Sequence, residues 1–404
     1  MPPTHLPPMP ITASASANAC GVGNQRLLDV IRSGQSQLRP VRLFEVDFPA
    51  FTGEINDHLL PALDDSLARF STRNTRIALA ALNDPTDGLR AAVEHARQRY
   101  GVHRIGIVLG TSTSGIYETE NAYIAHAETG LMPPQYDFVH QHLCVATAYF
   151  LRAELQLQGP CYAVSTACSS SSNAIISAQR LIHAGICDAV LTGGVDSLCR
   201  MTLQGFKSLD LVSDRPCTPL DRNRSGISLG EGAGLLLLER QQPEYTGCVH
   251  LLGAGESSDA HHITAPHPEG RGAALAMDRA LRQTGLVAAD IDYVNLHATG
   301  TLKNDAAEMT GLQAVLGTDT PCSGTKGLIG HTLGAAGGIE AIIACLSLKH
   351  RLLPGTCGLR ETDPAFDAQV LKETRTDLTV RYTMSNNFGF GGNNTALLFG
   401  WSHD

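Results

Sequence analysis

The chain has 404 residues, of which 43% are hydrophobic and 17% charged, and a net charge of −9. This length predicts two domains, or one large domain built from two similar halves. The negative charge and the lack of a long basic run argue against nucleic-acid binding, and no apolar run is long enough to span a bilayer.

Residues 1–10 are rich in proline and are predicted to form a flexible leader. They lack the basic and apolar segments of an export signal, so we expect a cytoplasmic protein. The 11 cysteines show neither CxxC pairs nor metal-like spacing. In a reducing compartment this pattern predicts mostly buried thiols and no metal site.

Short apolar stretches that end in glycine or a small polar residue are predicted to be strands. They are residues 103–110, 161–167, 188–194, 234–240, 249–255, 291–298 and 395–400. Apolar residues at helical spacing predict helices over 89–101, 171–185 and 335–350. Strands that alternate with helices indicate an α/β fold whose sheets are buried on both faces.

The same order of elements occurs twice along the chain. A helix leads to a strand and a polar loop over residues 89–115, and again over 272–305. In each half a strand, a polar turn and a helix follow, and two strands close the half. We therefore predict two stacked α/β halves, 11–246 and 247–404.

Cys168, in the run VSTACSSSS, ends an apolar strand and precedes a helix rich in small residues. A helix N-terminus offers partial positive charge and free N–H groups, which favour a thiolate over a thiol. An arbitrary cysteine is far more often a buried, inert residue. The position between strand and helix nevertheless favours a nucleophile here.

Two histidines lie at turns in the second half. His297 leaves a strand in NLHATGTLKNDAAEM, where it mirrors a polar loop of the first half, and this position favours a cleft over a purely structural role. Lys326 and His331 lie in the glycine-rich turn SGTKGLIGHTLGAAGG. That turn has neither the GxxxxGK[ST] nor the GxGxxG spacing, so we do not expect a nucleotide site.

A second glycine-rich segment, MSNNFGFGGNNTALLF, contains Phe388 and Phe390. Glycine lets backbone N–H groups approach a ligand closely, as a site for an anionic intermediate requires. A tight hairpin with two core aromatic residues is the alternative. Without the other segments the two interpretations are equally good.

Taken together, TACSS, HATGT, GTKGLIGH and NNFGFGG closely resemble the β-ketoacyl-acyl-carrier-protein synthases of the elongating type. The similarity covers the chain from residue 11 onward and includes the order and spacing of the motifs. It implies the thiolase fold, a duplicated α/β unit in a five-layered αβαβα core, and a dimer. It also implies an acyltransferase of fatty acid or polyketide synthesis with no bound cofactor, whose substrates are carried on the phosphopantetheine of acyl carrier protein.

The resemblance also implies roles for individual residues. The nucleophile would be Cys168, the other catalytic side chains would be those of His297, His331 and Lys326, and the backbone N–H groups of Cys168 and Phe390 would form the oxyanion hole. The remaining family positions are Thr299 and Thr301 on the pantetheine arm, Phe206 and Phe388 at the substrate, Glu340 as a buried acid near the lysine, and Asp259 and His262 in a mobile loop.

Several features differ from the common family pattern. Ala298 replaces the glycine of the usual HGTGT, and Thr113 stands where an aliphatic gate or glycine is usual. A polar gate predicts a non-standard acyl chain. The runs YDFVHQHLCVATAYFLRAEL and SLCRMTLQGFKSLD are similar to ketosynthases of aryl-polyene pigment clusters, which implies an aryl or polyenoyl substrate. The partner would be a second copy or a ketosynthase-like chain-length factor that lacks the cysteine.

An acidic carrier protein needs a basic docking patch, for which Arg69, Arg73, Arg76 and Lys207 are candidates, although a solvated surface would look the same. Two alternative functions fit the same fold. A degradative thiolase would normally show a second catalytic cysteine in a late CxG motif, and the C-terminal segment has none. A non-catalytic chain-length subunit would not need the intact cysteine and histidines.

Overall fold

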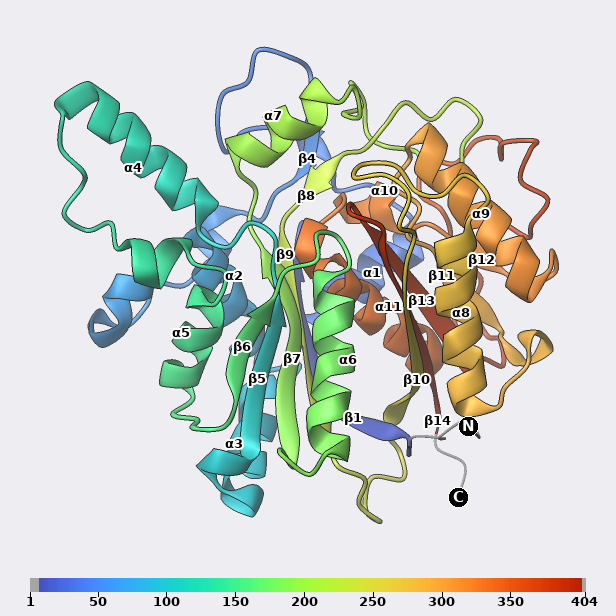
Figure 1. The fold of residues 1–404 in the computed structure, drawn as a ribbon, viewed down its shortest axis with the longest axis horizontal. Coiled ribbons are helices and arrows are strands. Elements are labelled where there is room, and N and C mark those ends of the chain that lie inside the picture. The colour runs from blue at the N-terminus through green and yellow to red at the C-terminus, as the bar shows by residue number, and fades with distance from the viewer. Residues whose placement is uncertain (1–6, 402–404) are drawn as a thin grey trace.

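The computed structural model describes residues 7–401 and consists of two packed α/β halves, coloured along the chain in Figure 1. The N-terminal half is built on a sheet in the order β6-β5-β7-β9-β1. The bounds are Met9–Asn18 (β1), Ile105–Gly110 (β5), Cys161–Val164 (β6), Ala189–Asp196 (β7) and Gly232–Glu239 (β9). Every residue of β5, β7 and β9 is buried, as expected of strands covered on both faces.

The C-terminal half repeats this sheet in the order β12-β11-β13-β14-β10. The bounds are Val249–Ser258 (β10), Tyr293–Asn295 (β11), Cys322–Ser323 (β12), Tyr382–Gly389 (β13) and Asn393–Trp401 (β14). In both sheets the second strand of this order runs parallel to its two neighbours, and the last three strands run antiparallel. Pairs at Met9–Leu251 and Pro10–His250 join the sheets through β1 and β10.

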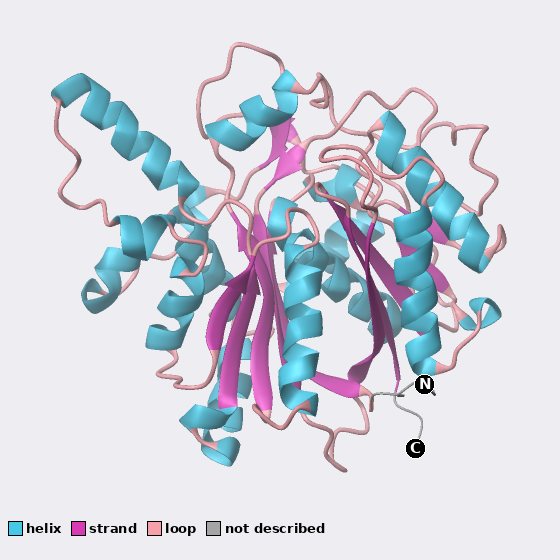
Figure 2. Ribbon diagram, viewed as in Figure 1, coloured by secondary structure: helices cyan, strands magenta, loops and turns pink. Residues whose placement is uncertain are grey.

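Helices form three layers around the two sheets, as Figure 2 shows by colour. α2 (Arg73–Leu82), α3 (Leu89–Tyr100) and α5 (Ala146–Glu154) pack on the outer face of the first sheet. α6 (Ser170–His183) and α11 (Ala336–His350) lie between the sheets with α1 (Asn24–Ser33). α8 (Arg271–Thr284) and α9 (Leu302–Leu316) cover the second sheet. These layers and the repeated strand order confirm the predicted duplicated thiolase fold.

Shorter elements lie around this core. β3 (Arg39–Pro40), β4 (Phe51–Gly53) and β8 (Leu229–Gly230) form a small sheet beside α7 (Arg200–Ser208), and β2 (Gly21–Val22) pairs with β1. α4 (Ile116–Thr129) projects from the body in Figure 1 and is followed by the helical turn Phe138–His142. α10 (Lys326–Ile329) precedes α11. The remaining turns are Asp57–Leu59, Asp65–Phe70, Val102–Arg104, Ala288–Asp290 and Leu333–Ala335.

Two segments, the N-terminal leader and the long apolar helix of the second half, differ from what the sequence predicts. β1 begins at Met9, which is 2% exposed, so the predicted leader is too long at its C-terminal end; residues 1–6 lie outside the described residues. The helical span Leu333–His350 is long and apolar enough to cross a membrane, but 89% of it is buried inside the protein. It serves as the middle layer of the core, so it gives no support to a membrane span.

The middle layer approaches the first sheet so closely that side chains are excluded at the contact. A Cβ added to Gly234 in β9 would lie 2.3 Å from the backbone carbon of Gly338 in α11. We expect Gly234→Ala to lower the free energy of unfolding by about 1–3 kcal/mol, because the added methyl group would clash with the backbone of α11, which cannot move away without disturbing the helix. Gly205→Ala in α7, where nothing lies within 4 Å, should instead stabilise by up to ~1 kcal/mol. Urea denaturation of both variants checks this, and equal effects would contradict it.

Candidate active site

Cys168 lies in the tight turn between β6 and α6. Ala167 has a φ of 51°, a left-handed conformation that is uncommon for a residue with a side chain. The N–H groups of Ser169 and Ser170 donate to the carbonyls of Thr166 and Ala167, which closes the turn. The thiol is thereby held at the junction of the two halves, with 6% of the residue exposed.

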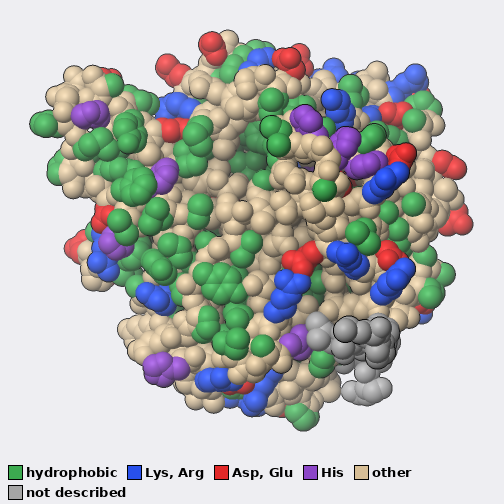
Figure 3. All heavy atoms as spheres, in the orientation of Figure 1, with side chains coloured by type: hydrophobic (Ala, Val, Ile, Leu, Met, Phe, Trp, Pro, Cys, Tyr) green, Lys and Arg blue, Asp and Glu red, His purple; other side chains and the backbone are tan. Residues whose placement is uncertain are grey.

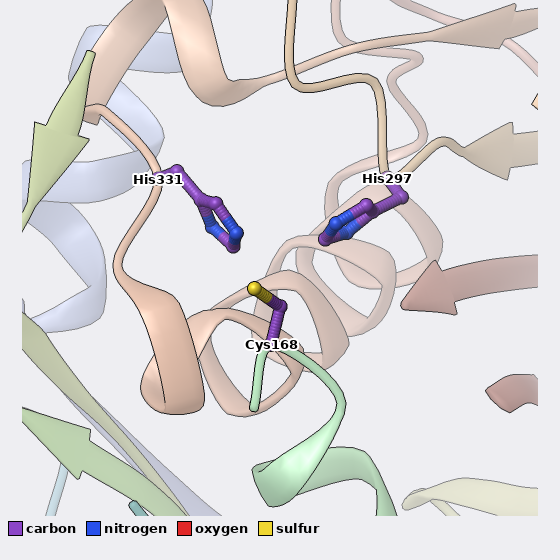
Figure 4. Close-up of side chains that lie close together, drawn as sticks. All are labelled: Cys168, His297 and His331. Carbon is purple, nitrogen blue, oxygen red and sulfur yellow. The ribbon is translucent and has the colours of Figure 1, made fainter. Parts of the chain in front are cut away.

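The two histidines of the second half converge on this thiol, as Figure 4 shows. His297 follows β11, and His331 lies between α10 and α11; each is 1% exposed. Their ring centroids are 5.1 Å apart at an interplanar angle of 85°. The donor atoms of Cys168, His297 and His331 all lie within 4.8 Å of one another. The structure therefore brings the three predicted side chains together.

Lys326 orients the ring of His297 through contacts on its Nδ1 side. Its ammonium donates to the carbonyl of His297 at 2.5 Å and lies 3.3 Å from Nδ1 of the same residue. Its third partner is the carboxylate of Glu340, at 2.5 Å. An ammonium group can only donate, so Nδ1 accepts and the proton of the neutral ring is on Nε2. The lysine thus selects the tautomer that presents an N–H group on the opposite side of the ring.

Burial keeps both imidazoles neutral. It lowers the pKa of His297 and His331 well below the usual range, and the charge of Lys326 lowers both further. Neither ring nitrogen of His331 has a hydrogen-bond partner among the described residues. Two neutral rings, one of them unpartnered, can donate hydrogen bonds to a carbonyl oxygen that enters between them.

The electrostatics of the thiol differ from the expectation of a resting thiolate. Burial raises the pKa of Cys168 to about 12, and Lys326 and the N–H group of Phe390 act in the opposite direction. The first N–H groups after Cys168 are already bonded to carbonyls of the turn, which weakens the effect of the helix end. The thiol is therefore protonated at rest, and its proton must leave as the sulfur attacks.

The second glycine-rich loop lies directly against Cys168. The backbone N–H group of Phe390 lies near enough to the sulfur of Cys168 to lower the pKa of its thiol. A Cβ on Gly389 would come within 2.7 Å of the carbonyl of Thr166 and 3.3 Å of the backbone nitrogen of Cys168. The absence of a side chain at Gly389 thus permits the contact. The glycine-rich loop and the backbone nitrogen of Cys168 therefore lie together beside the thiol.

A cleft of about 550 Å³ leads to these groups. Its lining includes four of the five predicted substrate residues, namely Thr299, Thr301, Phe206 and Phe388. Phe390, predicted for the oxyanion hole, and the loop residues Asp259 and His262 also line it. The hydroxyls of the two threonines are 2.9 Å apart, and the rings of Phe206 and Phe390 are 5.4 Å apart. The cleft therefore has a polar wall and an aromatic wall that meet at the thiol.

Comparison with known proteins assigns the family. Residues 9–244 match the family described as "Beta-ketoacyl synthase, N-terminal domain" and residues 249–360 match "Beta-ketoacyl synthase, C-terminal domain". The chain belongs to the beta-ketoacyl synthase family. It is 34% identical over 336 residues to 3-oxoacyl-[acyl-carrier-protein] synthase 2 of Vibrio harveyi, which covers 80% of this chain and 79% of that protein.

Other relatives of this ketosynthase agree. The mitochondrial 3-oxoacyl-[acyl-carrier-protein] synthase of Arabidopsis thaliana is 36% identical over 73% of this chain and 68% of that protein. Among solved structures, the ketosynthase ApeO in complex with its chain length factor ApeC from Xenorhabdus doucetiae is similar with a TM-score of 0.90 and 40% identity. That likeness covers 98% of both chains.

Two sequence-based assignments are wrong in this ketosynthase. Thr113 does not line the cleft: it is 1% exposed, and its hydroxyl binds the carboxylate of Asp196 and the carbonyl of Ser197. Arg73 cannot dock a partner, because it is 5% exposed and its guanidinium pairs with Glu231. In both cases a polar residue that was predicted to have a functional role instead forms hydrogen bonds with a buried carboxylate.

The other docking candidates keep some exposure. Arg69 and Lys207 are exposed, with their charged groups over the rings of Phe70 and Phe48. Arg76 is half-buried, and its guanidinium donates to three backbone carbonyls. Lys207 follows the cleft residue Phe206 directly. A docking role for these three residues stays a prediction.

The buried network around Arg73 makes stability depend on pH through Glu118. Burial raises the pKa of Glu118 to about 7, and its Oε2 has no partner among the described residues. A raised carboxyl pKa means that its stabilising contribution is complete below the unfolded value of 4.5 and is lost as the pH rises through 7. Glu118→Gln should match the wild type at pH 4 and exceed its unfolding free energy at pH 8 by about 1–3 kcal/mol. Urea titrations at both pH values check this, with Glu94→Gln, whose side chain is 44% exposed, as the control.

Sequence reasoning missed two acids that hold the loop of His297. Glu308 is 1% exposed, and its oxygens accept from the N–H groups of His297 and Ala298, each at 2.7 Å. Asp305 accepts from the N–H groups of Leu220 and Gly300. Burial raises the pKa of both. Their position in α9 directly after a polar loop was the available signal, since acids there can bind N–H groups of the preceding turn.

The same cluster of Cys168, His297 and His331 is also a possible metal-ligand set. These residue types bind zinc in other proteins. Here the buried ammonium of Lys326 next to one ring disfavours a further cation. No metal enters the chemistry below.

Proposed function

We propose that this ketosynthase condenses malonyl-carrier protein with an acyl group held on Cys168, as a β-ketoacyl-acyl-carrier-protein synthase. The observation that carries the proposal is the convergence of one thiol and two neutral imidazoles in the wall of one cleft. A set without a carboxylate next to an imidazole is poorly suited to activating water and well suited to stabilising an enolate.

The first step transfers the acyl group to the enzyme. The sulfur of Cys168 attacks the thioester carbonyl of an acyl-carrier protein, and the thiol proton passes to the departing pantetheine thiol. The N–H groups of Cys168 and Phe390 stabilise the tetrahedral oxyanion. This route fits a thiol that is protonated at rest.

The second step removes carbon dioxide from the malonyl thioester. As the carbon–carbon bond breaks, its electron pair forms an enolate whose oxygen accepts hydrogen bonds from His297 and His331. The enolate carbon then attacks the acyl-Cys168 carbonyl and expels the thiolate, which takes up one proton from solvent. Neutral rings are needed here, and burial together with Lys326 keeps them neutral.

The surface supports a protein partner beside the carrier protein. β6 lies at the edge of its sheet, and within the described residues no strand pairs with its outer side. Residues 116–142, which form the projecting helix α4 and the turn after it, carry exposed apolar side chains. Leu131 is 74% exposed, Tyr123 60% and Phe138 51%. Figure 3 shows hydrophobic side chains gathered on this lobe. An open strand edge and an apolar lobe suit a dimer, either with a second copy or with a chain-length factor.

The pathway is proposed from the likeness to the ApeO ketosynthase and from the runs that resemble aryl-polyene enzymes. The substrate would be an aryl or polyenoyl chain built on acyl carrier protein. Cytoplasmic location fits the cysteines, all of which are free, because the nucleophile must stay reduced.

The experiment is mass spectrometry of the protein after incubation with an acyl-carrier protein. We expect one acyl adduct, on Cys168. Cys144 is the internal control, since it is an exposed free cysteine and would report nonspecific acylation. An unmodified Cys168 would contradict the proposal and favour a non-catalytic chain-length subunit. Acylation from acyl-CoA but not from carrier protein would favour the thiolase alternative.

A further inference from the structure

Asn387 lies on β13, three residues before Phe390, and is fully buried. Its amide nitrogen donates to Oε2 of Glu340 at 2.5 Å, and its amide oxygen accepts from the hydroxyl of Ser172 at 2.6 Å. The backbone of α11 passes so close that a Cβ on Gly337 would lie 2.0 Å from the Ser172 hydroxyl. The amide is therefore fixed in both position and orientation.

Through Glu340 this amide is connected to the catalytic imidazole. Glu340 is 3% exposed, and its other oxygen binds Lys326, whose ammonium also contacts His297. A continuous chain of hydrogen bonds thus runs from Ser172, one helical turn after the nucleophile in α6, to the ring of His297. It passes from the first half of the molecule to the second.

We infer that Asn387 is a positioning residue for decarboxylation, which acts by holding the ion pair of Glu340 and Lys326 that orients His297. The inference rests on the proposed function and adds a residue to it. Asn387 satisfies the one carboxylate oxygen that the lysine does not bind, and a buried carboxylate oxygen without a donor is strongly unfavourable.

Loss of the amide donor has a defined chemical consequence. A proton leaves Nζ of Lys326 and binds the carboxylate of Glu340, so an ion pair becomes a neutral pair. The lysine then no longer presents a positive charge to Nδ1 of His297. Without that charge the ring can change tautomer or bind a proton, and it loses the fixed Nε2–H group that the enolate needs.

Two substitutions test this, each assayed for carbon dioxide release from malonyl-carrier protein and for acylation of Cys168. Asn387→Leu keeps the size and removes the donor, so we expect decarboxylation to fall by about 10²-fold and acylation to change by less than about threefold. Asn387→Asp should behave differently at different pH. A protonated carboxyl group can donate to Glu340 as the amide does, whereas the carboxylate cannot.

Asn387→Asp should therefore release carbon dioxide at nearly the wild-type rate at pH 6 and lose about tenfold or more by pH 8.5, while the wild type loses much less. Asn74→Asp is the matched control. Asn74 is equally buried, bonds to Thr147 in the outer layer, and is expected to keep the wild-type pH profile.

Equal loss of both reactions in Asn387→Leu would indicate a merely structural role, and a wild-type pH profile in Asn387→Asp would overturn the inference. If Asn387→Leu does not fold, the pH profile of Asn387→Asp decides. The wild type is measured in the same assays. Absence of both reactions in the wild type would count against the proposed function itself, independently of Asn387.

Discussion

Cys168→Ala is expected to lower condensation by about 10⁴-fold or more, to the background rate. In the proposed mechanism the sulfur of Cys168 holds the acyl group, and no other thiol lies beside both imidazoles among the described residues. Carbon dioxide release from malonyl-carrier protein should persist in this variant, because the histidines remain in place. Product formation by mass spectrometry and trapped carbon dioxide measure the two reactions separately.

Cys187→Ala is the matched control for that experiment. Cys187 is also buried, at 1% exposure, but it lies beyond the far end of α6 from the nucleophile. Its removal should cost some stability and leave condensation unchanged. Wild-type elongation by Cys168→Ala would refute the assignment of the nucleophile.

For His331→Ala we expect carbon dioxide release to fall by about 10²–10³-fold, with acylation of Cys168 affected far less. His331 is buried without a hydrogen-bond partner among the described residues, which is costly unless a substrate carbonyl occupies that position. Because burial lowers the pKa of His297 and His331 well below 6.5, wild-type decarboxylation should also be insensitive to pH between 6.5 and 8.

His250 supplies the comparison for His331. It is equally buried, but its ring nitrogens bond to the carbonyl of Cys248 and to Gln241. His250→Ala should therefore affect stability and spare decarboxylation. Undiminished carbon dioxide release by His331→Ala would remove the role assigned to that residue.

Much of the fold and of the central site could be predicted because both depend on patterns within short segments of the sequence. Strand and helix periods repeat in the same order in both halves, and Cys168, His297 and His331 each stand at a turn after or before an apolar element. Turns at the same end of stacked strands meet in space, so motifs far apart in the chain could be grouped. Helix α11 was also predictable, since its residues are apolar nearly all round.

Other features depend on tertiary contacts that leave no local pattern. Arg73 and Thr113 look like surface and gate residues in the sequence, yet each satisfies a buried carboxylate, of Glu231 and Asp196 respectively. The pKa of Cys168 followed burial and not its helix end. Strand β1 was missed because proline-rich residues precede it, while its partner strands are distant in sequence.

The bare backbone contact between Gly234 and Gly338 has a consequence for engineering. Because no side chain intervenes there, the spacing between α11 and its sheet cannot be tuned by exchanging one residue for a larger or smaller one. Substitutions meant to broaden the range of acyl chains should therefore avoid Gly234 and Gly338. They should change the cleft wall around Phe206, where a side chain of another size would alter the cleft without moving the thiol away from the imidazoles.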